Sequence, residues 1–265
     1  MRLNLKGSLI NKLLLIIVIS WIILAVIFGF TDLEISKAVV NKSSLWGNFG
    51  ADFGEVPGYV LITIALVVLI GGYNPNLRKQ KIPAYVIILI GIFVLISGFI
   101  FDSKDLIFNG GGIVLSLIIF VILTYNNDWK SYRKISAVII ILTVLNPILF
   151  IRITKALTGR VRFRDLLSDS DFTPWFLPPG LSGNQSFPSG HTSMSFMLIP
   201  LLMLVRERRW KDPVKIIVIF LVIGWALFVG LSRIVVGAHY ASDVLFAAGM
   251  TVLISIILYK KIYNE

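Results

Sequence analysis

Long apolar segments of similar length repeat along this chain, and they constrain its fold more than any other feature. Each is close to the 17 to 25 residues that a helix needs to cross a bilayer. Only 15% of the 265 residues are charged and 57% are hydrophobic, whereas a soluble domain has about 25% charged residues. The sequence therefore predicts an all-α, polytopic transmembrane helical bundle. The segments are too long and too uniformly apolar for the short alternating strands of an outer-membrane barrel.

The hydropathy pattern predicts about eight spans in a single integral membrane domain, residues 1–265. Their approximate limits are 13–30, 57–73, 83–101, 107–125, 135–154, 191–205, 216–232 and 239–259. Pro57 and Pro83 fall in the first turns of their spans, where proline removes no helical hydrogen bond. Pro147 and Pro200 fall inside spans and are expected to bend them.

The distribution of basic residues predicts the orientation of the bundle. Lys and Arg are enriched in cytoplasmic loops, and placing both termini in the cytoplasm puts sixteen of the 25 basic residues on that side. The first span is longer than the apolar region of a signal peptide, so we expect it to be retained. The sequence thus predicts a multi-pass protein of the cytoplasmic membrane with both termini inside.

Six basic residues break this rule because they fall at extracytoplasmic ends of spans. They are Arg152, Lys155, Arg160, Arg162, Arg164 and Arg233. One or two arginines at helix ends are commonly explained by contacts with lipid headgroups. A cluster of five within residues 152–164 is better explained as an anion site, and guanidinium groups match the oxygens of phosphate.

Both histidines of the chain, His191 and His239, fall at this same predicted face. A lone histidine at a membrane edge is most often a polar cap, but two beside a basic cluster indicate chemistry. His239 and Asp243 are one helical turn apart, so the carboxylate can hold the ring and leave its other nitrogen free as a nucleophile or base. Ser189 and Gly190 precede a helix expected to begin near His191, where free backbone N–H groups favour an anion.

Three motifs in this order resemble the signature of the type 2 phosphatidic acid phosphatase superfamily. They are Lys155 and Arg162 separated by six residues, then Pro188-Ser189-Gly190-His191, then Ser232-Arg233 followed by His239 and Asp243. The resemblance covers residues 155–243 by motif. One departure is Phe163, because the family usually has proline after the arginine of the first motif.

The resemblance implies a role for each matching residue in phosphate binding. Lys155, Arg162 and Arg233 would hold the phosphate oxygens. Ser189 and the backbone amide of Gly190 would complete that site.

The resemblance also implies a division of chemical roles. His239 would attack phosphorus, Asp243 would orient His239, and His191 would protonate the leaving oxygen. The activity expected is that of a metal-independent phosphatase that needs no cofactor and acts through a phosphohistidine intermediate. Its active site would face the extracytoplasmic side.

The architecture of the family resembles only part of this chain. The family core has six helices with the first motif after the third, whereas here the first motif follows the fifth predicted span. Residues 83–125 are therefore predicted to be an added helical hairpin, and 155–190 an extracytoplasmic loop that carries the first motif. The aromatic residues of 165–187 are expected either to form an interfacial belt or to shape the path of the lipid.

The expected substrate is a lipid phosphate within the bilayer, either a phosphomonoester or a pyrophosphate, and no nucleic-acid partner is expected. Polyprenyl pyrophosphate, phosphatidate and phosphatidylglycerol phosphate share the phosphate that the motifs would bind, so the sequence leaves that choice open, as it does the oligomeric state. The non-enzymatic alternative is an anion or lipid-phosphate transporter with the same basic site. A metal site formed by His191, His239 and Asp243 is disfavoured by the nearby cations.

Overall fold

Helices account for all of the regular secondary structure in residues 2–263, the part of the chain that the structure, a computed structural model, describes. Seven helices or continuous runs of helices are long and apolar enough to cross a membrane. They are α1 (Arg2–Val39); α2 (Leu45–Phe53) with α3 (Val56–Gly71); η1 (Lys79–Lys81) with α4 (Ile82–Ile100); α5 (Lys104–Thr124); η2 (Trp129–Tyr132) with α6 (Arg133–Thr143), η3 (Val144–Ile151) and α7 (Arg152–Thr158); α9 (Pro213–Val235); and α10 (Ala241–Tyr263). The predicted all-α, multi-pass membrane fold is therefore confirmed.

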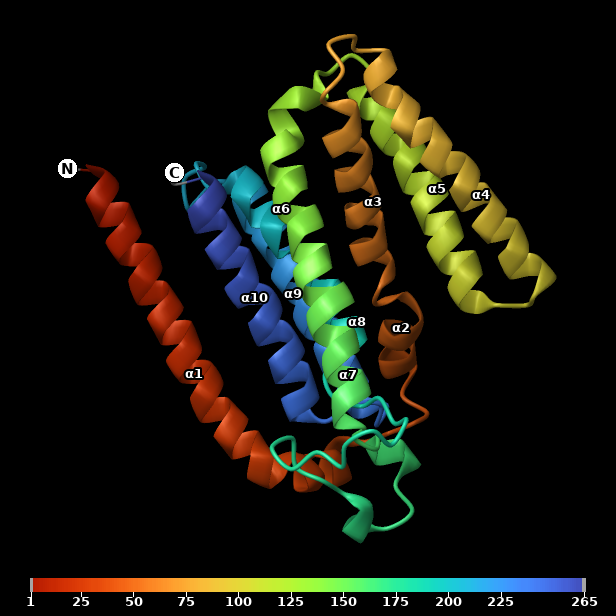
Figure 1. Ribbon diagram of the computed structural model, residues 1–265, viewed down its shortest axis with the longest axis vertical. Coiled ribbons are helices and arrows are strands. Elements are labelled where there is room, and N and C mark those ends of the chain that lie inside the picture. The colour runs from red at the N-terminus through yellow and green to blue at the C-terminus, as the bar shows by residue number, and fades with distance from the viewer. Residues whose placement is uncertain (1, 264–265) are drawn as a thin grey trace.

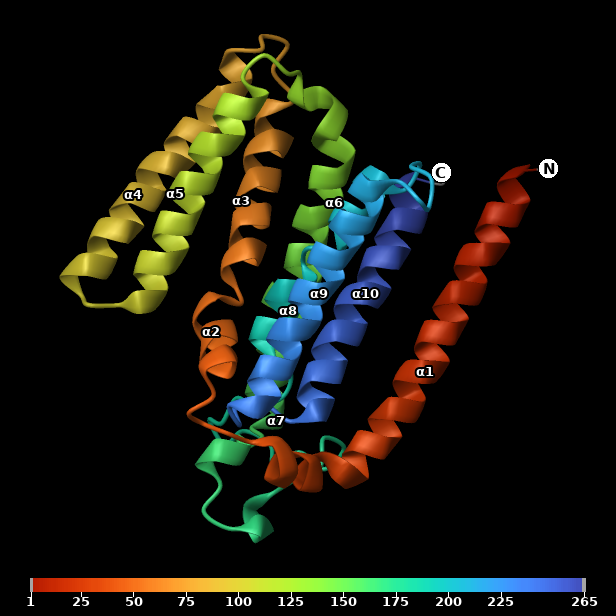
Figure 2. The same cartoon turned by 180° about the vertical axis from the view of Figure 1, so that it is seen from behind.

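The helices form one bundle, with α1 at one edge and the α4–α5 pair at the other (Figure 1). Helices α3, α6, α9 and α10 lie between these edges, as the reverse view also shows (Figure 2). The two ends of the described chain lie at the same end of the bundle (Figure 1). Residues 159–189, with the short 3₁₀ helices η4 (Phe163–Asp165) and η5 (Asp169–Asp171), cover the opposite end.

The predicted span 191–205 differs from the other seven. It consists of α8 (Gly190–Phe196) and the 3₁₀ helix η6 (Ile199–Val205), and it is shorter than the helices that qualify as membrane spans. Pro200, which lacks the N–H of an α-helix interior, lies in the first turn of η6. Because a 3₁₀ helix rises about 2.0 Å per residue against 1.5 Å in an α-helix, the segment reaches farther than its residue count suggests. The structure thus has seven long helices and one shorter apolar segment in place of eight equal spans.

The other prolines lie where the sequence placed them, with one difference in detail. Pro57 and Pro83 are in the first turns of α3 and α4, as predicted. Pro147 is inside the long helical run 129–158, and the chain around it, η3, is a π-helix. Wider π-type turns accommodate the missing N–H and the proline ring without ending the helix.

This π-helical stretch is tied to the rest of the bundle by a buried amide. Asn146 is fully buried and donates from Nδ2 to Oγ of Ser193 at 2.8 Å and to Oγ1 of Thr251 at 2.6 Å. These bonds join η3 to α8 and α10. They fix the direction in which α7 leaves the bundle toward the covered end.

The α4–α5 hairpin packs on α3, away from α10 (Figure 1). Two small residues let its helices touch along their backbones: a Cβ added at Gly98 would lie 2.7 Å from the backbone N of Ile107, and one at Gly110 would lie 2.7 Å from that of Leu95. A buried cluster joins the hairpin to α3 and η2. It contains Val67, Val68, Ala84, Leu117, Val121 and Trp129.

Candidate active site

Segments that are far apart in the sequence meet at the end of the bundle covered by residues 159–189. The backbone N–H of Ser189, before α8, donates to the carbonyl of Asp243 in α10 at 3.1 Å. A Cβ added at Gly190 would lie 3.7 Å from Nζ of Lys155 in α7. The three motifs of the sequence are therefore adjacent in space.

His239 and Asp243 face each other as their spacing predicts. Nδ1 of His239 lies 3.4 Å from Oδ2 of Asp243, and the two side chains are 2% and 0% exposed. Gly237, with φ of 68°, makes the turn from α9 that brings His239 to this position. Burial lowers the pKa of His239 to about 4, so the imidazole is neutral near pH 7, as a nucleophile requires.

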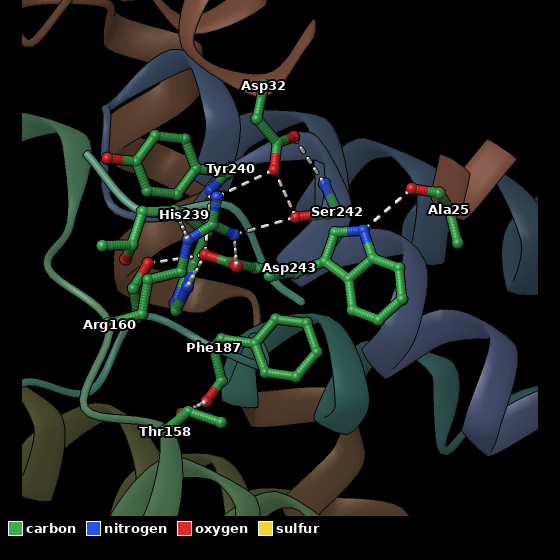
Figure 3. A network of polar contacts seen from close by, with 12 residues as sticks. Ala25, Asp32, Thr158, Arg160, Phe187, His239, Tyr240, Ser242 and Asp243 are labelled. Carbon is green, nitrogen blue, oxygen red and sulfur yellow. Dashed lines mark hydrogen bonds and ion pairs between the residues drawn. The ribbon is translucent and has the colours of Figure 1, made fainter. Parts of the chain in front are cut away.

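The carboxylate of Asp243 is held from several sides (Figure 3). Its Oδ2 accepts hydrogen bonds from Oγ of Ser186 at 2.5 Å and from the backbone N–H of Tyr240 at 3.0 Å. Its Oδ1 accepts from Nη1 of Arg160 at 2.6 Å. The carboxylate therefore has a fixed orientation, with Oδ2 toward His239.

The guanidinium of Arg160 is buried and donates hydrogen bonds to other residues of the chain. Its guanidinium is 1% exposed and donates to Oδ2 of Asp32 at 2.9 Å, to Oγ of Ser242 at 2.8 Å and to the carbonyl of Thr173 at 2.8 Å, in addition to Asp243. We counted Arg160 among five basic residues of an anion site, and the structure corrects this count. Four of the five N–H donors of Arg160 have partners among the described residues, and these bonds join α1 to α10 (Figure 3).

At this end of the bundle, two other arginines have buried donors that no described residue accepts. Arg233, in α9, is 6% exposed, and its Nε and Nη1 are buried without a hydrogen-bond partner among the described residues. Nε of Arg162 is also buried without a hydrogen-bond partner among the described residues. Because an unpaired buried donor is costly, these groups favour an anion such as phosphate.

Ser189 lies at the N-terminus of α8, directly before Gly190. Its side chain is fully buried and caps α8, where Oγ accepts from the backbone N–H of Thr192 at 3.3 Å and contacts the hydroxyl of the same residue at 2.9 Å. Its hydroxyl thus caps the N-terminus of the helix that contains Gly190 and His191.

His191 contacts a segment that the motifs do not include. Its Nδ1 lies 3.1 Å from Oε1 of Glu55, which is the last residue before α3. Its Nε2 lies 3.2 Å from the backbone carbonyl of Ala51 in α2. Both ring nitrogens therefore face the α2–α3 segment.

A cavity of about 690 Å³ opens beside Lys155 and Gly190. Glu55, Tyr59 and Arg152 contribute polar groups to its lining. The apolar lining comes from α3, η3 and α8, and it consists of Ile62, Pro147, Ile148, Ile151 and Met194, with Ala156 of α7. The cavity has the mixed lining that an anion attached to an apolar chain requires.

Residues 136–265 match the family model described as the PAP2 superfamily. The chain belongs to the PAP2 superfamily. Comparison with curated proteins and with solved structures gave no match. Members of the PAP2 superfamily are phosphatases, so a hydrolase is the general class of enzyme to which this chain is assigned.

The PAP2 match contains all of the residues singled out from the sequence, but two residues of the assembled site precede it. Asp32 is in α1 and contacts Arg160, and Glu55 follows α2 and contacts His191. Neither residue belongs to a motif. The only signal in the sequence was an acidic residue close to an apolar segment at the predicted outer face.

The loop at 165–187 packs inward in this PAP2 protein. Nε1 of Trp175 donates to the carbonyl of Ala25 in α1 at 2.8 Å, and its ring lies 4.7 Å from that of Phe246 in α10. Phe163, in place of the motif proline, lies edge-on to Tyr240 at 6.4 Å. These aromatic contacts hold α1 and the loop over the covered end of α10.

Proposed function

We propose that this PAP2 protein is an integral membrane lipid phosphatase that works through a phosphohistidine on His239. The observation that carries the proposal is the buried His239 beside Asp243, at the same end of the bundle as arginines with buried donors that no described residue accepts. A neutral imidazole held by a carboxylate is an activated nucleophile. Nearby cations stabilise the charge that develops on a transferring phosphoryl group.

The lining of the adjacent cavity supports a lipid as the substrate. Lys155 and Gly190 form one part of this lining, and isoleucine, proline and methionine side chains form another. A lipid phosphate has the same division into a charged head and an apolar chain. Polyprenyl pyrophosphate, phosphatidate and phosphatidylglycerol phosphate are the candidate substrates.

In the proposed reaction, Lys155, Arg162 and Arg233 hold the phosphate. His239 attacks phosphorus, the leaving oxygen takes a proton supplied through His191, and water then hydrolyses the phosphohistidine. Each of these steps uses only side chains of this chain and water. The positive-inside distribution of the basic residues supports an active site on the extracytoplasmic face of the cytoplasmic membrane.

The test is phosphate release by the purified protein in detergent from each of the three lipids, with His239→Ala as the control. We expect release from at least one lipid by the wild type and none by the variant. Movement of a lipid phosphate across sealed vesicles without its hydrolysis would instead support the transporter alternative.

A further inference from the structure

The ring of His191 has an unusual pair of neighbours. Nε2 faces the backbone carbonyl of Ala51 at 3.2 Å, and Nδ1 faces Oε1 of Glu55 at 3.1 Å. The His191 and Glu55 side chains are 29% and 24% exposed, so water does not fully surround either group. Burial and the nearby cations Arg233 and Lys155 influence the protonation of both groups, in addition to the contact between them.

The carbonyl of Ala51 determines where one proton lies. A carbonyl oxygen only accepts hydrogen bonds, so the contact is favourable when Nε2 carries a hydrogen. A neutral ring then has a bare lone pair on Nδ1, directed at Glu55. An ionised Glu55 would place two acceptors face to face at 3.1 Å.

Both contacts are favourable only when the pair holds one proton more than a neutral His191 beside an ionised Glu55. In one form Glu55 is protonated and donates to Nδ1, and in the other His191 is an imidazolium that donates to ionised Glu55. The two forms differ only in the position of that proton along the same hydrogen bond. The Glu55–His191 pair is therefore a store of one proton.

The pair lies beside the proposed phosphate site. A Cβ added at Gly190 would be 4.0 Å from Oε1 of Glu55 and 3.7 Å from Nζ of Lys155. Glu55 also lines the cavity, where its Oε2 accepts from the hydroxyl of Tyr59 at 3.4 Å. An ionised carboxylate here would repel a phosphate, whereas the pair with its additional proton would not, so substrate binding favours the protonated pair.

We propose that Glu55 is a positioning residue that shares the acid proton with His191. The inference rests on the proposed phosphatase function. When the bond between His239 and phosphorus forms, the bond from phosphorus to the leaving oxygen breaks, and that oxygen receives the proton of the pair. In the second half of the reaction, the Glu55–His191 pair takes a proton from water and the water oxygen attacks phosphorus. The bond from phosphorus to His239 then breaks to release phosphate.

This role makes a different prediction from a purely structural one. A Glu55 that only anchors α8 to the α2–α3 segment would affect every substrate alike. A shared acid proton matters most for a leaving alkoxide, which departs poorly without it, and least for nitrophenolate. General acid assistance is typically worth about 10² to 10⁴ in rate.

The decisive variant is Glu55→Gln, because its amide N–H can still donate to Nδ1 but cannot give up a proton. We expect kcat for phosphatidate in mixed micelles to fall by about 10²-fold or more, and kcat for p-nitrophenyl phosphate to fall by less than about 10-fold. Glu207→Gln, which changes an exposed carboxylate that pairs with its neighbour Arg206, is the matched control and should leave both rates unchanged. Turnover of the aryl phosphate by Glu55→Gln also reports that the variant is folded.

The double variant Glu55→Gln/His191→Ala gives an independent readout. If the two residues share one proton, the double variant should be no slower on phosphatidate than the slower single variant. Equal losses on both substrates, or losses that multiply in the double variant, would overturn the inference. If Glu55→Gln does not accumulate, Glu55→Asp takes its place, and the same substrate dependence is required of it.

The failure of this inference is distinguishable from failure of the proposed function. Wild-type protein that releases phosphate from polyprenyl pyrophosphate but from neither monoester would retain the proposed function and overturn the role of Glu55, since no alkoxide would need the proton. Wild-type protein that is inactive on all three substrates would overturn both.

Discussion

Nη1 of Arg160 lies 2.6 Å from Oδ1 of Asp243, in a site where both side chains are buried. Nη2 of the same guanidinium lies 2.9 Å from Oδ2 of Asp32. One arginine thus neutralises two carboxylates, one from α1 and one from α10. Helix α1, which precedes the PAP2 match, is in this way connected to the carboxylate that faces His239 (Figure 3).

Removal of Arg160 is expected to be costly, because Arg160→Gln leaves two buried carboxylates without their cation. Breaking a buried pair in this way typically costs about 3–5 kcal/mol. Adding Asp32→Asn removes one of the two charges, so the double variant should recover at least about 1 kcal/mol relative to the sum of the single variants. The measurement is the free energy of unfolding in detergent, with phosphatase kcat as a second readout.

The control for this cycle is the exposed ion pair between Lys37 and Asp169, 2.6 Å apart. Surface pairs contribute about 0–1 kcal/mol, so Lys37→Gln with Asp169→Asn should change stability little. Strict additivity in the Arg160 and Asp32 cycle would contradict the electrostatic account of this network.

The sequence predicted the helices and motifs well because both are local patterns. The spacing of His239 and Asp243 places them one turn apart in any helix, and the structure has them 3.4 Å apart. Seven of the eight spans predicted from the apolar segments are long helices, since length and hydropathy decide whether a helix can cross a bilayer.

The sequence could not predict the partners that come from distant segments. Asp32 is 128 residues from Arg160, and no spacing rule connects them. Glu55 reaches His191 only because α2 and α3 pack beside α8. Arg160 was grouped with the phosphate ligands because charge alone does not distinguish an arginine that binds a ligand from one that binds two carboxylates.

Arg233 is expected to bind the phosphate through its planar fork of donors. Arg233→Lys keeps the charge but loses this geometry, and a hydrogen bond to a charged group is worth about 1.5–3 kcal/mol. We therefore expect the inhibition constant for vanadate to rise about 10- to 100-fold, as measured in the phosphate-release assay. Arg209→Lys, at an exposed position in the loop before α9, is the control, and an unchanged inhibition constant in Arg233→Lys would argue against a phosphate contact.

The buried, neutral His239 predicts a pH dependence of stability. Burial lowers its pKa to about 4, whereas the unfolded value is about 6.5. Between these values the unfolded state binds a proton that the folded state does not, so stability is lost as pH falls from about 6.5 toward 4. Stability attributable to this group is fully present above pH 6.5.

The comparison that isolates His239 is with His239→Gln, which does not titrate in this range. The unfolding free energy of the wild type relative to the variant should decrease by up to about 3 kcal/mol between pH 7 and pH 4. Thermal unfolding in detergent at several pH values measures this difference. A constant difference across that range would mean that His239 is not held neutral.

The orientation of the bundle is testable because the chain has no cysteine. The connection between α3 and α4, which contains Lys79, and residues 159–189, which contain Asp171, lie at opposite ends of the bundle (Figure 1). By the positive-inside rule, Asp171→Cys should react with an impermeant thiol reagent in intact cells and Lys79→Cys should not. The reverse pattern would place the site on the cytoplasmic face.

The most direct test of the central claim is to trap the covalent intermediate. The purified protein is mixed with a substrate labelled on phosphorus and quenched in alkali, in which the bond between phosphorus and a histidine nitrogen persists. We predict label on the wild-type protein that is released by acid and maps to His239, and no label on His239→Ala. Turnover by the wild type with the label on another residue, or phosphate release by His239→Ala, would contradict the account.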